Sequence, residues 1–119
     1  MANGSKPFRV RSVGTNLTAG VDNIIYTCPA NHTAKVELLF VANTTSGNKT
    51  VSIKWHDVNE NKNFFVVGGY TISAYSYLKL DGSYLVLNAG DYLVVTTEAA
   101  STMDATVSVE EYFDPANNN

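Results

Sequence analysis

The segment "KTVSIKWHD", residues 49–57, alternates apolar and polar side chains more cleanly than any other part of the chain. Val51, Ile53 and Trp55 fall on one side of an extended backbone, and the residues between them are polar. Successive side chains of a β-strand point to opposite faces, so this period of two predicts a strand. One apolar and one polar face are typical of an antiparallel strand that covers a core on one side only.

The same period recurs in "YTISAYSYLKL", residues 70–80, and in "MDATVSVEEYF", residues 103–113, and no helical period is evident. Other segments, such as "KVELLFVA" at 35–42, are apolar on both faces, which indicates either central strands or strands whose outer face meets another subunit. Turn signals separate the segments, among them "TSGNK" at 45–49, Gly68-Gly69 and Asp81-Gly82. The predicted strands are 8–14, 23–28, 34–43, 49–57, 63–67, 70–80, 83–87, 91–97 and 104–113.

Short strands at regular spacing predict an all-β fold, an antiparallel β-sandwich of eight or nine strands with jelly-roll or Greek-key connections. A chain of 119 residues suits one domain. We assign that domain to residues 8–113, an N-terminal arm to 1–7 and a polar C-terminal tail to 114–119. The arm and the tail either fray or order against neighbouring subunits.

The inward-facing periods also predict which side chains form the core: Val36, Leu38, Phe40, Val51, Ile53, Trp55, Ile72, Leu78, Val107 and Val109. Apolar and aromatic residues on the opposite faces are candidates for contacts between subunits, because interfaces are enriched in aromatic side chains. These candidate interface residues are Leu39, Val41, Tyr75 and Tyr77. Packing of the two tyrosines within their own sheet is the alternative.

Composition excludes several classes of protein. The net charge is −3 and basic residues do not cluster, so we expect no nucleic-acid binding. No apolar run approaches the roughly 20 residues that span a bilayer, so we expect no membrane insertion, and the first residues do not resemble a signal peptide. A charged fraction of only 16% leaves surface that could be buried against neighbours.

Residues capable of catalysis or metal binding are scattered. Cys28 and His32 are the one formal pair of nucleophile and base, but a Cys at a strand end is more often a small buried side chain. His56 and Asp57 point to opposite faces of their strand, which disfavours a shared metal ion. The aspartates lie at predicted turns, where Asp accepts hydrogen bonds from the backbone. We therefore predict no catalytic residue, no metal, no cofactor and no enzymatic activity.

Two stretches carry a resemblance to a known class of protein. They are "IYTCPANHTAKVELLFVANTTSGNKTVSIKWHD", residues 25–57, and "LNAGDYLVVTTEAASTMDATVSVEEYF", residues 87–113. This order of strands and turns resembles small β-sandwich virion proteins of tailed bacteriophages, particularly cyanophages and other marine phages. The chain departs from the pattern at Cys28, where Val is usual, and at Asn31-His32, which replaces a Gly-Lys-like turn.

The resemblance implies a non-enzymatic structural component of a virion that is made in the host cytoplasm. It further implies a homo-oligomer whose partners are other virion proteins, such as the major capsid protein or proteins of the tail and portal. A capsid decoration or cement protein and a head–tail or tail accessory protein both fit. A carbohydrate- or receptor-binding module of a tail or fibre is the second class, because exposed aromatic rings can stack on sugars. A hydrolase, the third class, requires carboxylates or a Cys–His pair that meet in a cleft.

Overall fold

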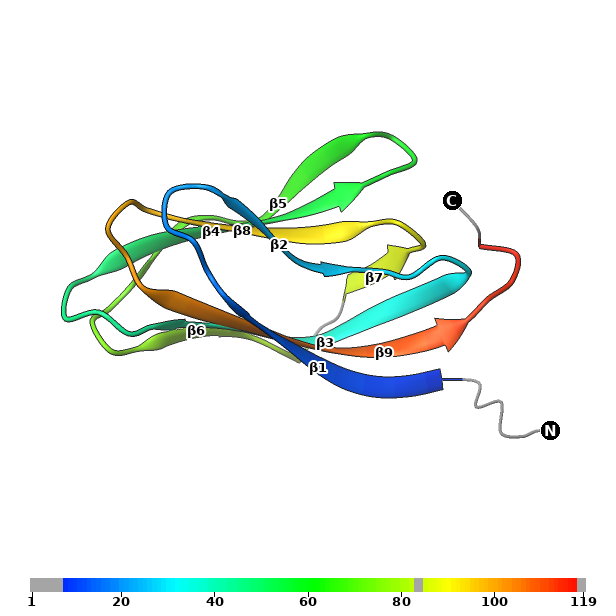
Figure 1. Ribbon diagram of the computed structural model, residues 1–119, viewed down its shortest axis with the longest axis horizontal. Helices are drawn as coiled ribbons and strands as arrows, with labels where there is room; N and C mark the ends of the chain where they lie inside the picture. Colours follow the sequence, from blue (N-terminus) through cyan, green and yellow to red (C-terminus); the bar gives the residue numbers. More distant parts are fainter. Residues whose placement is uncertain (1–7, 83–84, 118–119) are drawn as a thin grey trace.

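The computed structural model describes residues 8–82 and 85–117, and these residues form nine antiparallel strands without a helix. Among them, no helix is therefore long and apolar enough to cross a membrane. The all-β sandwich predicted from the sequence is confirmed (Figure 1). The strands are β1 Phe8–Asn16, β2 Asp22–Thr27, β3 His32–Asn43, β4 Lys49–Asp57, β5 Lys62–Ile72, β6 Tyr77–Leu80, β7 Leu85–Asn88, β8 Tyr92–Thr97 and β9 Met103–Phe113.

The strands pair as a nested series. β1 pairs with β9, β2 with β8, β3 with both β6 and β7, and β4 with β5. One sheet has the order β1-β9-β3-β6, with β7 also on β3, and the other has the order β2-β8-β4-β5. If β6 and β7 count as one interrupted strand, this is the eight-stranded jelly roll, a long antiparallel hairpin folded into two sheets.

β6 and β7 lie one after the other along the same edge of β3. Leu80 pairs with Leu39 and Leu85 pairs with Val36, so the pairing along this edge of β3 is interrupted at Glu37 and Leu38. The interruption keeps this edge from forming a continuous ladder. Short edge strands of this kind give a neighbouring chain little to pair with.

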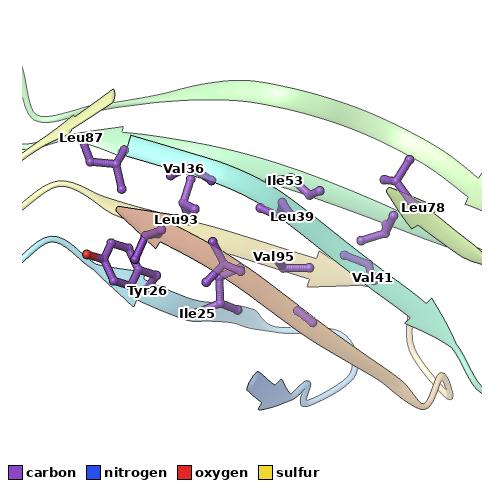
Figure 2. Packing of buried hydrophobic residues seen from close by; sticks show 14 of the residues in the cluster. Ile25, Tyr26, Val36, Leu39, Val41, Ile53, Leu78, Leu87, Leu93 and Val95 are labelled. Carbon is purple, nitrogen blue, oxygen red and sulfur yellow. The ribbon is translucent and has the colours of Figure 1, made fainter. Parts of the chain in front are cut away.

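Most of the predicted core lies between the two sheets (Figure 2). The structure buries seven of the predicted core residues: Val36, Val51, Ile53, Ile72, Leu78, Val107 and Val109. Trp55 is partly buried and packs against them. Val51 and Ile53 of β4 are therefore buried as the alternation predicts, and burial decreases only from Trp55 to the end of the strand.

A β-bulge in β3 reverses which side chains face the core in the second half of that strand. Val36 pairs with Val109 and Leu38 with Ser108, so Glu37 is an extra residue without a partner on β9. An extra residue moves every later side chain to the opposite face. Leu39 is 4% exposed and Val41 is also buried, so the prediction of both as interface residues is wrong. Leu38 and Phe40 lie outside the buried core, so their core prediction is wrong too.

The predicted strand 70–80 is in fact the end of one strand, a turn and a second strand. β5 continues through Gly68-Gly69, where its register against β4 shifts, because Val51 pairs with Tyr70 and Ile53 with Val67. Gly69 adopts φ +64°, which suits a glycine in a bulge. The chain breaks instead at residues 73–76.

The two predicted terminal segments differ in how much of them the structure describes. Residues 1–7 and 118–119 lie outside the described residues. Residues 114–117 form a turn against the loop that precedes β3, with the Asp114 amide donating to the Asn31 carbonyl at 2.7 Å. The Asn117 side chain donates to the His32 carbonyl at 2.9 Å.

Candidate interaction surface

A buried asparagine organises one end of the sandwich. Asn43, the last residue of β3, is 1% exposed, and its Nδ2 donates to the carbonyls of Gly47, Ile72 and Ser73 at 2.9–3.2 Å. Its Oδ1 accepts the Thr45 amide at 3.0 Å. One side chain therefore joins the loop after β3 to the turn after β5. A fully bonded polar group of this kind fixes both segments in place.

That turn holds Tyr75 in an unusual conformation. Tyr75 has φ 56°, and the residue is 75% exposed. A bulky residue rarely adopts a positive φ, and such strain persists where the surroundings over-determine it. Tyr77 is 55% exposed on the outer face and stacks on Phe40, with 4.7 Å between ring centroids. Both tyrosines of the predicted interface are therefore on the surface, and their role in a contact stays a prediction.

The edge strand β5 carries a second exposed apolar surface, which the sequence analysis did not identify as functional. We call it the β5 edge, defined by four apolar residues that are 41–67% exposed: Phe64, Phe65, Val66 and Tyr70. Residues 63–72, "NFFVVGGYTI", contain no charge. Monomeric proteins usually protect an edge strand with charges or proline. A ten-residue uncharged run was the sequence signal that could have revealed this edge.

Packing on β4 holds the β5 edge in place. The Phe64 ring stacks on Trp55 with 5.2 Å between centroids, and Lys54 Nζ lies 5.4 Å from the centroid of Phe65. The β4–β5 hairpin forms the upper right corner of the molecule in Figure 1. The edge is therefore a supported surface, not a loose loop.

An apolar cavity of about 330 Å³ opens between β5 and the interrupted strand β6–β7. Two charged residues, Lys79 and Asp81, lie in its wall, and Lys79 Nζ is 3.4 Å from Asp81 Oδ2. The cavity reaches the core through Leu39 and Leu93. Its apolar lining consists of Val36, Leu39, Val66, Leu80, Leu85 and Leu93.

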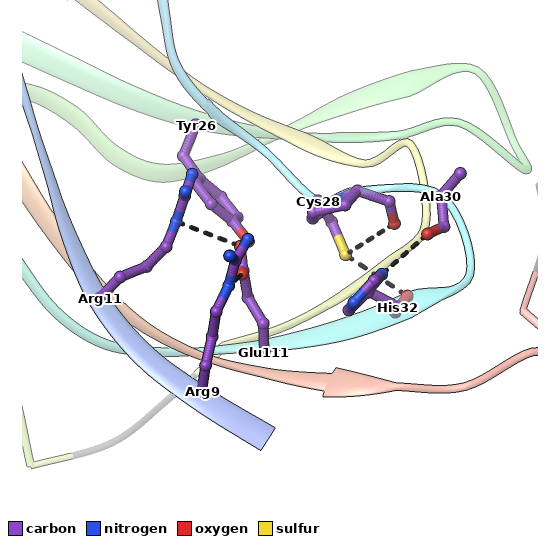
Figure 3. A network of polar contacts seen from close by, with 8 residues as sticks. Arg9, Arg11, Tyr26, Cys28, Ala30, His32 and Glu111 are labelled. Carbon is purple, nitrogen blue, oxygen red and sulfur yellow. Dashed lines mark hydrogen bonds and ion pairs between the residues drawn. The ribbon is translucent and has the colours of Figure 1, made fainter. Parts of the chain in front are cut away.

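A buried carboxylate joins the two sheets at the opposite edge (Figure 3). The Glu111 side chain is 0% exposed, and it accepts a hydrogen bond from the Tyr26 hydroxyl. Arg9 Nε lies 2.6 Å from Oε1 and Arg11 Nε lies 3.4 Å from Oε2. Burial alone would raise the pKa of Glu111, but the bonds from Tyr26 and Arg9 and the arginine charges outweigh it and lower that pKa. Burial and Glu111 together raise the pKa of Tyr26.

Asp91, in the turn between β7 and β8, also joins the two sheets, as its predicted turn position suggests. Its carboxylate accepts the backbone amides of Val58 and Asn88 at 3.0 and 2.9 Å and the indole Nε1 of Trp55 at 3.3 Å. It is fully buried. The buried carboxylates of Glu111 and Asp91 are thus both bonded to groups of the protein itself. Such satisfied buried groups are expected where a carboxylate has a structural role.

Cys28 and His32 are close in sequence, but their reactive atoms face backbone groups (Figure 3). The Cys28 thiol lies 3.4 Å from the His32 carbonyl, and the His32 Nδ1 lies 2.8 Å from the Ala30 carbonyl. Burial, with the charges of Glu111 and Asp91, raises the pKa of the Cys28 thiol to about 11. The thiolate that a nucleophile requires is therefore disfavoured at neutral pH.

His56 and Asp57 also bond separately. His56 Nδ1 lies 2.8 Å from the side-chain oxygen of Asn63, and Asp57 accepts the Asn59 amide at 3.0 Å. Within residues 8–82 and 85–117, no group of three or more His, Cys, Asp or Glu side chains could hold a metal ion.

Comparison with known proteins identifies the fold but not a family. No protein-family model and no curated protein matches the chain. Solved structures do match. A chain of the Bacillus endospore appendages, described as disulfide-linked pili, is 17% identical with a TM-score of 0.56, and the match covers 96% of this chain and 95% of that one. A chain of the T13 viral particle of IBDV is 10% identical with a TM-score of 0.57.

The match to the viral chain covers 98% of this chain but only 34% of the viral one, so this chain spans about a third of it. At these identities the likeness shows a shared fold alone. Both matches extend over nearly the whole sandwich, in agreement with the jelly-roll pairing of the strands.

Proposed function

We propose that this protein is a non-enzymatic structural subunit of a virion, present in many copies. In its finer form, the proposal is a tailed-phage protein that decorates or cements the capsid or that belongs to the head–tail or tail apparatus. Its partners are other copies of the chain and the major capsid, tail or portal-associated proteins. It is synthesised in the host cytoplasm and resides in the particle.

The observation that carries the proposal is the combination of a core held by buried polar groups with exposed apolar surface at a sheet edge. Glu111, Asp91 and Asn43 are buried and fully engaged in holding strands and loops together. Phe65 and its neighbours on the β5 edge are exposed. A rigid block with apolar edges gains stability when a neighbour covers those edges. The jelly-roll fold that it shares with a virus-particle chain and a pilus chain is compatible with that role.

Contacts between copies of this chain are expected to be non-covalent. A disulfide would have to use Cys28, the one cysteine of the sequence, which is 1% exposed. Exposed apolar and aromatic surface is then the principal source of affinity.

The test is to purify the particles on a density gradient and to count the chain against the major capsid protein by quantitative mass spectrometry. A subunit of the particle co-purifies at a fixed ratio that survives repeated gradients. A chain that washes away, or that stays in the slowly sedimenting fraction, overturns the proposal.

A carbohydrate- or receptor-binding module is the second candidate, favoured by Tyr75 and by the Tyr77–Phe40 stack on the outer face. Exposed rings braced by buried polar groups are suited to stacking on a flat ligand. A glycan array with wild type and the Tyr75→Ala/Tyr77→Ala variant tests it. Binding that the double substitution abolishes, with the fold intact, supports the module; no binding by wild type removes it.

A further inference from the structure

We propose that the β5 edge is a self-association interface at which two copies of the chain pair antiparallel about a twofold axis. This inference rests on the proposed function, because it specifies how subunits of the assembly join. The pairing would unite two four-stranded sheets, each in the order β2-β8-β4-β5, into one continuous sheet of eight strands. The occupant of the edge is thus a second copy of β5 itself.

The backbone of β5 is available for such pairing. β5 bonds to β4 on one side and is the last strand of its sheet on the other. Its outer N–H and C=O groups face no strand among the described residues. An added strand supplies affinity through backbone hydrogen bonds, and the side chains on either face add specificity.

Charge favours a second copy as the occupant. A twofold axis sets a strand opposite itself, so any charge can meet its own copy. Lys62 is the one charged residue of β5, and it meets Lys62 of the partner only if the axis passes through residue 62. Every axis within residues 63–72 avoids like-charge contact. On the β1 edge, by contrast, an axis at Val10 would set Arg9 opposite Arg11.

Register irregularities narrow the position of the axis. The pairing of β5 with β4 is regular from Lys62 to Phe65 and shifts beyond it. Bulges increase twist, so the flattest part of the edge is this first segment. An axis near Phe64 sets the two Phe64 residues opposite each other and sets each Asn63 opposite Phe65. Aromatic cross-strand pairs are among the favourable ones.

The available area is consistent with a dimer. Aromatic side chains bury 150–250 Å² each, so the exposed parts of Phe64 and Phe65, which lie within the paired segment, offer roughly 200 Å² per copy. A stable interface needs about 800 Å² per partner, so these two rings supply about a quarter of it. The β5 backbone, Val66 and the rim of the adjoining cavity are the source of the remainder.

Sedimentation velocity of the full chain over a range of concentrations tests the inference. Phe65→Glu puts a charge at the centre of the interface, close to Lys54, which can accept it as an ion partner without loss of fold. Val10→Lys is the matched control, because Val10 is 64% exposed on a different free edge and pairs with Glu110, so the new charge again faces an opposite one. We expect the wild type to be a dimer, the dissociation constant to rise at least about tenfold in Phe65→Glu, and no change in Val10→Lys.

Cysteine cross-linking gives a second measurement that does not depend on one charged variant. Residues 63, 64 and 65, substituted one at a time by Cys, are expected to yield at least one disulfide-linked dimer on mild oxidation, because cross-strand Cβ atoms lie within reach of a disulfide. Val10→Cys, which leaves β5 unchanged, is expected to form no disulfide-linked dimer. Monomeric wild type, dimerisation unaffected by Phe65→Glu, or no cross-link at any of the three positions overturns the β5 interface. None of these results decides the proposed function, which is tested separately by whether the chain co-purifies with particles.

Discussion

Adjacent leucines in β3 offer a direct test of the bulge that sets the register of the sandwich. Leu39 faces the core at 4% exposure, and Leu38 faces outward. Substitution of a buried Leu by Ala usually costs 2–5 kcal/mol, from lost burial and from the cavity left behind. Leu39 already lines a cavity, so we expect a cost near the lower end, about 2–3 kcal/mol. Leu38→Ala should cost about 1 kcal/mol or less.

Urea denaturation followed by the fluorescence of Trp55, the one tryptophan, measures both costs. Wild type, Leu38→Ala and Leu39→Ala are compared at one low protein concentration, because self-association would add stability to all three. In a thermal scan, about 4 °C per kcal/mol corresponds to a fall of roughly 8–12 °C for Leu39→Ala. The bulge predicts that Leu39→Ala is clearly the more damaging. Equal costs, or a larger cost for Leu38→Ala, would refute the assigned register. They would indicate that inward and outward side chains alternate along β3 without a bulge.

Three further predictions concern the buried polar groups. Glu111→Gln should lower the free energy of unfolding by about 1–3 kcal/mol at pH 7, because it removes the charge that Arg9 and Arg11 face. Since the pKa of Glu111 is lowered in the folded state, its contribution is complete above the ordinary value of about 4.3 and is lost as the pH falls below it. The gap between wild type and Glu111→Gln in urea titrations should therefore narrow below about pH 4; a gap that widens there contradicts the assignment. Asn43→Ala should lower the free energy of unfolding by about 2 kcal/mol or more, because it leaves the carbonyls of Ile72 and Ser73 unpaired. The control Asn48→Ala, at an exposed position, should cost less than about 1 kcal/mol. Similar thermal shifts for the two variants would contradict a stabilising role of Asn43. The Cys28 thiol should react with a thiol reagent at pH 8 far more slowly in the native protein than in urea, as its raised pKa and burial require, and equal rates would show it to be accessible.

The sequence predicts the fold class because most strands alternate without interruption. Val51 and Ile53 on β4 and Val107 and Val109 on β9 are buried as their period requires. Turn residues separate most of the strands, so their number follows as well. What the pattern cannot reveal is one extra residue in a strand that is apolar on both faces. Nothing in "KVELLFVA" marks Glu37 as the bulge, because either register buries a leucine.

The sequence also contains signals for two features that periodicity alone does not reveal, the buried Glu111 cluster and the exposed β5 edge. Glu111 stands at an inward position of β9, two residues after Val109, and Arg9 and Arg11 share one face of β1. A charged residue on an inward period predicts a buried partner of opposite charge, but only the pairing of β1 with β9 shows which residues meet. The β5 edge likewise depends on topology, because an apolar run is central or exposed according to its place in the sheet.

The central claim is that this chain is a structural subunit, and a cryo-EM reconstruction of purified particles tests it most directly. We expect density for the nine-stranded sandwich at symmetry-related positions, in many copies, with the β5 edge or the Tyr75–Tyr77 surface covered by a neighbour. Particles in which the chain is neither visible nor detectable would contradict the claim.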